Sequence, residues 1–226
     1  MVTASRHSPQ ARSPGDAKRG YRSALRDGHA RLTRRAIVEA GARLFEAQGY
    51  AATTIDAVAR EAGVSRKTVF AAVGGKAQLL KYAWEWSLVG DDEPVPMLER
   101  PAVKKIQAET DPARALHLWV AMVLVVAGRA APIGQVLVVA ADGDDQAAVM
   151  LAESEEQRLL GARAFIGHLA SIGGVRPRMT ADRAADLCWA LMDPMLYRRL
   201  VLERGWSVTS YSRWLESSLT AAILPI

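Results

Sequence analysis

The sequence predicts an all-α protein. Apolar residues recur at helical spacing through most of the 226 residues, and residues that start or stop helices divide the chain into pieces of helix length. No segment shows the alternation of apolar and polar residues that is typical of a β-strand. The chain is long enough for one large domain or two small ones with a buried core.

Charge is unevenly distributed along the chain. Residues 1–80 contain 14 Lys and Arg against 6 Asp and Glu, whereas residues 81–226 contain 15 against 18. A basic front and a mildly acidic rear indicate a head that binds a polyanion, followed by an ordinary globular body. The plainer interpretation is that Arg is simply a common surface residue in this chain.

Residues 1–29 are predicted to form a disordered basic arm. Arg, Ser, Pro and Gly dominate this segment, and it has few large apolar side chains with which to build a core. Two interpretations stay open. The arm is either a solvated tail or a segment that follows the phosphates or the minor groove of DNA. Order is expected to begin near Ala30.

Residues 30–78 are predicted to form a domain of three helices. The first helix ends at Gly49, a residue typical of helix stops. A short second helix follows Thr53-Thr54, because a threonine ahead of an apolar-periodic run is typical of an N-cap. Ser65 is expected to cap the third helix, which covers 66–72.

The connection between the two short helices has the pattern of a helix-turn-helix. Gly63 supplies a positive φ at low cost, and Ala59 is small enough for the helices to cross closely. Val64 and Val69 are expected to pack in the shared core. The outward face of the third helix is then free to enter the major groove of DNA.

Residues 30 to about 80 resemble the DNA-binding domain of TetR-family transcriptional regulators. The helix-turn-helix alone would be weak evidence, but here the expected helix precedes it and Gly74-Gly75-Lys76 opens a long helix after it. The pieces that carry the resemblance are Arg35 to Gly49, Gly49-Tyr50, Thr53-Thr54-Ile55, Val58 to Ser65, Thr68-Val69-Phe70 and Lys76.

The resemblance implies a set of DNA contacts. Thr54 would offer its hydroxyl and backbone N–H to a phosphate, and Lys76 would clamp another. Arg66 and Lys67 could chelate guanine O6 and N7, although a phosphate contact is as plausible for either, and Thr68 suits a thymine methyl. A solvated surface helix is the plainer alternative. The full predicted set is Arg34, Arg35, Thr53, Thr54, Ser65, Arg66, Lys67, Thr68, Phe70 and Lys76.

The third helix departs from the family pattern in two places. The family usually has Tyr where Phe70 stands, and that hydroxyl commonly binds phosphate. It commonly has His or Tyr at or near Ala71-Ala72 and Phe where Val73 stands. DNA binding is therefore expected to depend more on Arg66, Lys67 and the N-terminal arm.

Residues 79–226 are predicted to form an all-helical ligand-binding and dimerisation domain. A linker with two prolines follows Gly90. The resemblance implies that the last two helices pair across a two-fold axis, giving a homodimer through about 180–223 that can read a palindrome. Leu215, Leu219 and Ile223 form an apolar stripe that is expected to need a partner. The predicted helices are about 101–109, 111–130, 132–141, 144–172, 180–204 and 207–223.

Large aromatic side chains and methionines in this region suit an apolar pocket. Ordinary core packing is the plainer interpretation for each of them, and His168 is more simply a satisfied or exposed histidine. The predicted ligand-binding residues are Trp84, Trp119, Met122, Val123, Phe165, His168, Trp189 and Met192.

No cofactor, metal site or membrane span is expected. The single cysteine, Cys188, cannot form an intrachain disulfide, which favours an intracellular chain, and the four histidines lack metal-ligand spacing. The N-terminus lacks the apolar core of a signal peptide. The most hydrophobic run, Ala115 to Gly128, is shorter than the roughly 20 residues of a membrane span. These features predict a soluble, cytoplasmic protein.

The patterns favour a ligand-responsive regulator whose partners are double-stranded operator DNA and an unknown small-molecule inducer. The resemblance to TetR-family regulators implies a repressor that a small apolar or amphipathic molecule releases from a palindromic operator. An enzyme is not expected, because the sequence has no Gly-x-Ser-x-Gly elbow and no phosphate-binding glycine loop. A non-specific architectural DNA-binding protein is the second alternative. The basic arm favours it, and the large apolar rear domain argues against it.

Overall fold

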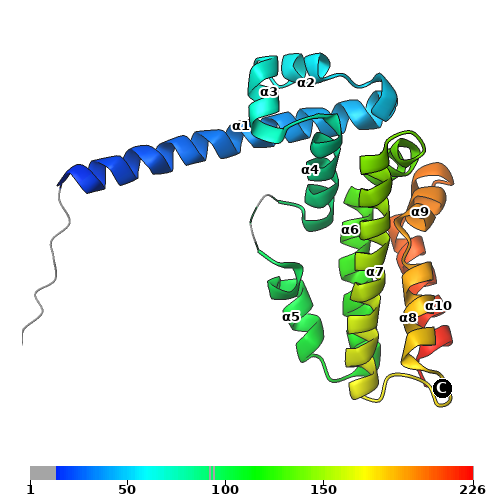
Figure 1. Cartoon of the computed structure of the whole chain (residues 1–226). Coiled ribbons are helices and arrows are strands. Elements are labelled where there is room, and N and C mark those ends of the chain that lie inside the picture. The colour runs from blue at the N-terminus through cyan, green and yellow to red at the C-terminus, as the bar shows by residue number, and fades with distance from the viewer. Residues whose placement is uncertain (1–13, 92, 94, 226) are drawn as a thin grey trace, which may run out of the picture.

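The computed structural model describes residues 14–91, 93 and 95–225, with the backbone alone for 14–27. Every regular element in these ranges is a helix, which confirms the predicted all-α class (Figure 1). A small head of α1, α2 and α3 lies at one end, and α4 leads from it to an elongated helical body. The elements are α1 (Pro14–Ala52), α2 (Ile55–Glu61), α3 (Arg66–Val73), α4 (Lys76–Val89), the short 3₁₀ helix η1 (Met97–Glu99), α5 (Pro101–Ala108), α6 (Pro112–Ala141), α7 (Asp145–Ser171), α8 (Ala181–Leu191), α9 (Pro194–Tyr197), the π-helical segment η2 (Arg198–Glu203) and α10 (Val208–Ile223).

Two clusters of buried apolar side chains hold these helices together. The first begins in the head with Phe45 and Val69 and continues into the body through Ile133 of α6. The second fills the rest of the body and includes Leu116 and Ile166. Burying each of these large side chains stabilises the fold by roughly 1.5–3 kcal/mol. Because the first cluster crosses from head to body, the two parts share packing.

The start of α1 differs from the predicted arm. Residues 14–29 belong to α1, which projects away from the body in Figure 1, whereas 1–13 lie outside the described residues. Pro14 suits the first helical position, where its missing N–H is not needed, and the Ala, Arg and Lys that follow favour helix. Gly49, with a φ of 81°, interrupts the helical geometry as predicted.

The central helix α6 is one helix where the sequence predicted two. It runs through Pro132 without a break. A proline inside a helix costs about 3 kcal/mol, and here buried neighbours on both sides, Ala130, Ala131 and Ile133, offset that cost. By length and composition alone α6 could cross a membrane. It packs against α1, α4, α5, α7, α9 and α10, which is the arrangement of a core helix.

The predicted helix 180–204 is broken into three pieces. α8 ends at Leu191, and α9 begins at Pro194. Proline disfavours helical geometry in the residue before it, and Asp193 is extended, with a ψ of 124°. Its carboxylate accepts a hydrogen bond from the Met195 N–H at 2.7 Å and so caps α9.

The apolar stripe of α10 was predicted wrongly as a surface that needs a partner. Leu215, Leu219 and Ile223 are at most 1% exposed and belong to the body's own core. α10 packs against α6 and α8, which cover this stripe within one chain. Helical periodicity shows that a face is apolar but cannot show which helix buries it.

Candidate DNA-binding surface and ligand cavity

The α2–α3 turn has the geometry of a helix-turn-helix. The Thr54 hydroxyl accepts the Ala57 N–H at 3.1 Å, and the Ser65 hydroxyl accepts the Thr68 N–H at 3.1 Å, so each capping side chain satisfies a helix N-terminus. Gly63 lies in the left-handed region with a φ of 67°. These contacts fix how α3 leaves α2.

The outward face of α3 presents a basic and aromatic surface. Arg66 and Lys67 are exposed, and Phe70 is 45% exposed. The Arg66 guanidinium lies 5.6 Å from the centre of the Phe70 ring, and one of its nitrogens is 3.3 Å from the Asp56 carboxylate. An ion pair this exposed is weak, so a contact of Arg66 with a phosphate or a base stays a prediction.

Thr53 is an exception among the predicted DNA-binding residues. It is 1% exposed. Its hydroxyl donates to the Gly49 carbonyl at 2.8 Å and accepts from the Gln48 amide at 3.3 Å. The Thr53 side chain therefore ties the start of the α1–α2 connection back to the kink at Gly49 and is not on the surface, because a hydroxyl buried here must be satisfied inside the protein.

Three other predicted basic residues have partners in the head, and two of them, Lys76 and Arg34, join different helices. The Lys76 ammonium donates to the Tyr50 carbonyl at 3.0 Å and lies 4.3 Å from the Tyr50 ring centre. Arg34 donates to the Ala72 carbonyl at the end of α3, at 3.0 Å, and Arg35 pairs with Glu39 at 2.8 Å. The Lys76 ammonium also donates to the Ala51 carbonyl at 3.5 Å, which leaves one of its three donors unused, so a phosphate contact stays a prediction.

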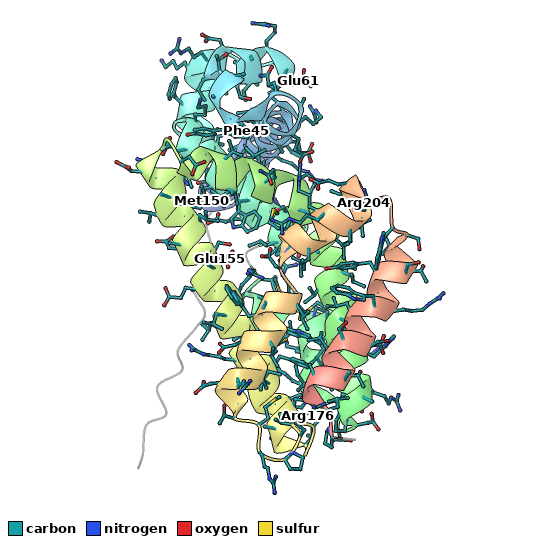
Figure 2. All side chains as sticks on the ribbon, turned by 90° about the vertical axis from the view of Figure 1, so that its right-hand side faces the viewer. Phe45, Glu61, Met150, Glu155, Arg176 and Arg204 are labelled. Atoms are coloured by element: carbon teal, nitrogen blue, oxygen red, sulfur yellow. The ribbon has the colours of Figure 1, made fainter. Side chains whose placement is uncertain are left out.

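A cavity of about 580 Å³ lies in the body, between α4, α5, α6, α7 and α8. Its walls are mostly apolar, and its lining on α7 extends from Met150 to His168. Figure 2 labels Met150 at the head end of α7 and Glu155 further along the same helix. The structure brings all eight predicted pocket residues to this cavity: Trp84, Trp119, Met122, Val123, Phe165, His168, Trp189 and Met192.

Part of the cavity wall is built from stacked rings and sulfur atoms. Trp119 and Phe165 stack with ring centres 4.5 Å apart and planes 1° from parallel. The Trp119 indole N–H donates to the Met192 sulfur at 2.9 Å, and the Cys188 sulfur is 3.3 Å from the same atom. Burial raises the pKa of the Cys188 thiol to about 12, so it stays protonated and unreactive.

Two polar side chains in the lining already have partners in the protein. His168 Nε2 is 3.1 Å from the Glu109 carbonyl, which agrees with the interpretation of a satisfied histidine. Arg158, which the sequence analysis missed, has a side chain only 18% exposed and pairs with Glu155 at 2.7 Å. Arg158 lies seven residues before Phe165, which places both on one face of α7. This spacing could have predicted Arg158 as a residue of the cavity lining.

α4 connects the cavity to the head. Trp84 is 6% exposed, belongs to the buried cluster that begins in the head, and lines the cavity. The Arg129 side chain of α6 donates to the carbonyls of Ser87 and Leu88 at 3.1 and 3.0 Å and so ties down the other end of α4. A molecule in the cavity would touch the helix that begins beside the DNA-binding surface.

Comparison with known proteins agrees with this architecture. Residues 37–83 match the family model described as bacterial regulatory proteins, tetR family. A protein from Mesorhizobium loti MAFF303099, described as a TetR-family transcriptional regulator, has a similar structure. Its TM-score is 0.65 at 18% identity, over 85% of this chain and 95% of that one. No match is found among curated proteins.

Two further solved structures share the fold. One is a transcriptional regulator from Saccharomonospora viridis in complex with choline. Its TM-score is 0.66 at 19% identity, over 84% of this chain and 97% of that one. The other is NalD from Pseudomonas aeruginosa, the secondary repressor of the MexAB-OprM multidrug efflux pump. Its TM-score is 0.63 at 19% identity, over 86% and 98%.

The described residues form a helix-turn-helix head joined to a helical body. Residues 37–83 match the family model of tetR-family regulatory proteins, and most of the chain shares its fold with a solved TetR-family transcriptional regulator.

Proposed function

We propose that this protein is a homodimeric, cytoplasmic repressor that a small apolar or amphipathic molecule releases from a palindromic operator. One observation carries the proposal. Trp84 belongs at once to the buried cluster of the head and to the wall of a 580 Å³ apolar cavity. Residues 30–78 serve as the DNA-binding domain in this proposal, and 79–226 bind the ligand and the second subunit.

The proposed DNA contacts start from the exposed end of α3. Arg66 and Lys67 reach base edges or phosphates in the major groove, and Phe70 makes an apolar contact with a sugar or a thymine methyl. The capping residues Thr54 and Ser65 bring helix N-termini close to the phosphates. The basic balance of the first 80 residues adds attraction that weakens with salt.

The proposed dimer places two heads on the two halves of one operator. The α10 stripe is buried, so the second subunit must use other parts of the segment 180–223. Exposed apolar side chains stand where α10 begins: Leu202 is 52% exposed, Trp206 39% and Val208 50%. These residues are suitable contacts for a second copy.

The proposed switch is a movement of α4. A molecule in the cavity presses on Trp84 and shifts α4. The two heads of the dimer then move further apart than the two halves of the operator, and the protein leaves the DNA. The ligand can weaken operator binding by no more than the difference between its own affinities for the released and the DNA-bound conformations. The similar regulator solved in complex with choline supports a small-molecule input to this fold, and NalD, described as a repressor, supports the direction of regulation.

Titration of the DNA that flanks the gene tests the proposal. The wild-type protein is expected to bind one palindrome as a dimer, and Arg66→Ala/Lys67→Ala to lose that binding. Lys104→Ala/Lys105→Ala is a matched control, because it removes two equal charges from exposed positions of α5. If both double variants lost operator affinity equally, binding would depend only on total positive charge. That result would favour a non-specific architectural DNA-binding protein.

A further inference from the structure

One wall of the cavity is formed by η1 and α5 together, a segment from Met97 to Ala108 that we call the strap. α5 lies at the edge of the body beside α6 (Figure 1), and within the described residues its main packing partners are α6 and η1. The strap contributes five side chains to the cavity lining: Met97, Leu98, Val103, Ile106 and Gln107.

Met97 and Leu98 are apolar side chains of the strap that lie outside the apolar core. They are 39% and 63% exposed, and neither belongs to the two clusters of buried side chains or to the half-buried apolar side chains packed against them. Val103 and Ile106, on the same strap, are buried. Because Met97 and Leu98 are adjacent and both line the cavity, they offer it an apolar surface that the rest of the described chain leaves exposed.

An ion pair fixes the strap to the end of α4. Arg100 ends η1 and directly precedes α5. Its guanidinium donates to both carboxylate oxygens of Asp91, at 2.8 and 2.9 Å, which is the two-pronged geometry that orients an arginine well. The same guanidinium donates at 3.4 Å to the carbonyl of Val89, the last residue of α4. The pair therefore sets where the strap lies relative to α4.

The plainer interpretation of Met97 and Leu98 is that they are incidental apolar residues of a surface connection, which are common in proteins. Val138 and Val139 of α6 fit that description, because they are adjacent, 38% and 57% exposed, and outside the cavity lining. The position of Met97 and Leu98 differs, since both line a cavity of about 580 Å³ with mostly apolar walls. A ligand with an apolar part could remove their surface from water there.

We propose that Met97 and Leu98 complete the ligand site. They contact an apolar part of the bound molecule and slow its departure, and the ion pair between Asp91 and Arg100 holds them in place. Because Trp84 of α4 also lines the cavity, a molecule packed against the strap touches both of the pieces that this ion pair joins. The inference rests on the part of the proposed function that makes the cavity the ligand site.

Binding of the dye N-phenyl-1-naphthylamine tests the inference on the full-length protein without DNA. The dye is uncharged and apolar, and it fluoresces more strongly when it leaves water. Met97→Ser/Leu98→Ser is expected to weaken dye binding at least about 10-fold, because two apolar side chains no longer cover the dye. Stopped-flow mixing should show the loss mainly as faster dissociation. Wild-type affinity in this variant would overturn the inference, and so would a wild-type protein that does not bind the dye.

Val138→Ser/Val139→Ser is the matched control. It also replaces two adjacent, partly exposed apolar residues by serine, but at positions outside the cavity lining. Dye affinity in this control should stay within about 2-fold of wild type. An equal fall in both double variants would mean that the dye binds to exposed apolar surface in general, which would contradict the role of the strap.

A single substitution protects the test against misfolding. Leu98→Ser changes the more exposed of the two side chains, so its cost to folding is small, and it should still weaken dye binding about 3-fold or more. Unchanged dye affinity in this variant overturns the inference. The assay contains no DNA, so its result is separate from that of the operator titration. A protein that binds the dye through Met97 and Leu98 but recognises no operator would refute the proposed function and leave the inference standing.

Discussion

The Tyr50 hydroxyl donates a hydrogen bond to the Asp144 carboxylate at 2.6 Å and so joins head and body. The two residues are 94 positions apart. Tyr50 follows the kink of α1, and Asp144 caps α7, accepting the Gln146 and Ala147 N–H groups at 2.9 and 3.2 Å. The cap of a helix that lines the cavity is thus tied to the base of the DNA-binding head.

Removing this hydroxyl should weaken the junction. Tyr50→Phe is expected to lower the free energy of unfolding by about 1–2 kcal/mol, because the lost hydrogen bond has a charged acceptor. Urea denaturation measures the change. Tyr82→Phe is the control, since the Tyr82 hydroxyl has no hydrogen bond within the described residues. Equal losses in the two variants would mean that the Tyr50 hydroxyl contributes nothing specific.

Acid should weaken the linker between α4 and α5. Hydrogen bonds from Arg100 to Asp91, at 2.8 and 2.9 Å, lower the pKa of Asp91 to about 2. A carboxylate with a lowered folded-state pKa contributes stability above its unfolded pKa of about 3.9 and loses it as pH falls through the folded value. Stability from this pair is therefore expected to disappear between about pH 4 and pH 2. Melting curves of Asp91→Asn should fall less steeply over that window, and parallel curves would exclude the pair as a contributor.

Trp84 should couple ligand binding to DNA release. Trp84→Phe keeps an apolar ring in the buried cluster that begins in the head. The smaller ring makes less contact with a molecule in the cavity. Operator affinity without ligand is expected to stay within about 3-fold of wild type, because the head keeps its packing, whereas ligand-induced release weakens. Trp86→Phe, on α4 but outside the cavity lining, is the matched variant. If the ligand released Trp84→Phe from the operator as readily as it releases the wild type, the proposed switch would not depend on the contact between Trp84 and the cavity.

Restoring the family's tyrosine on α3 should strengthen DNA binding. Phe70 is 45% exposed, so Phe70→Tyr places a hydroxyl within reach of the backbone of bound DNA. Operator affinity is expected to rise about 3- to 10-fold, the value of one hydrogen bond. The slope of affinity against salt should not change, because the new group is uncharged. Weaker binding would place Phe70 in an apolar contact that a hydroxyl disrupts.

Local sequence signals predicted the head well. Thr54, Ser65 and Gly63 act within a few residues of themselves, so their capping and turn geometry is readable from the chain. The eight predicted pocket residues line one cavity, because large aromatic and sulfur side chains tend to face the interior of a helical body. Whether a ligand contacts them is not encoded in that pattern.

Tertiary packing decided the features that were predicted wrongly. Pro132 stays inside α6 because buried neighbours on both sides outweigh its cost, whereas Pro194 breaks its helix. The Leu215 stripe is covered by helices distant in sequence. Among the described residues, buried N–H groups of Trp189 and Arg158 lack a partner, which could not be predicted, since the surroundings of a buried donor are a property of the assembled fold.

The ratio of affinities for the operator and for a scrambled duplex of equal length tests the central claim most directly. At one fixed salt concentration, the wild-type ratio is expected to reach about 10³ or more, and Arg66→Ala/Lys67→Ala should bring it close to 1 while retaining most of the scrambled-duplex affinity. A wild-type ratio near 1, or a ratio that the double variant leaves intact, would contradict sequence-specific recognition through α3.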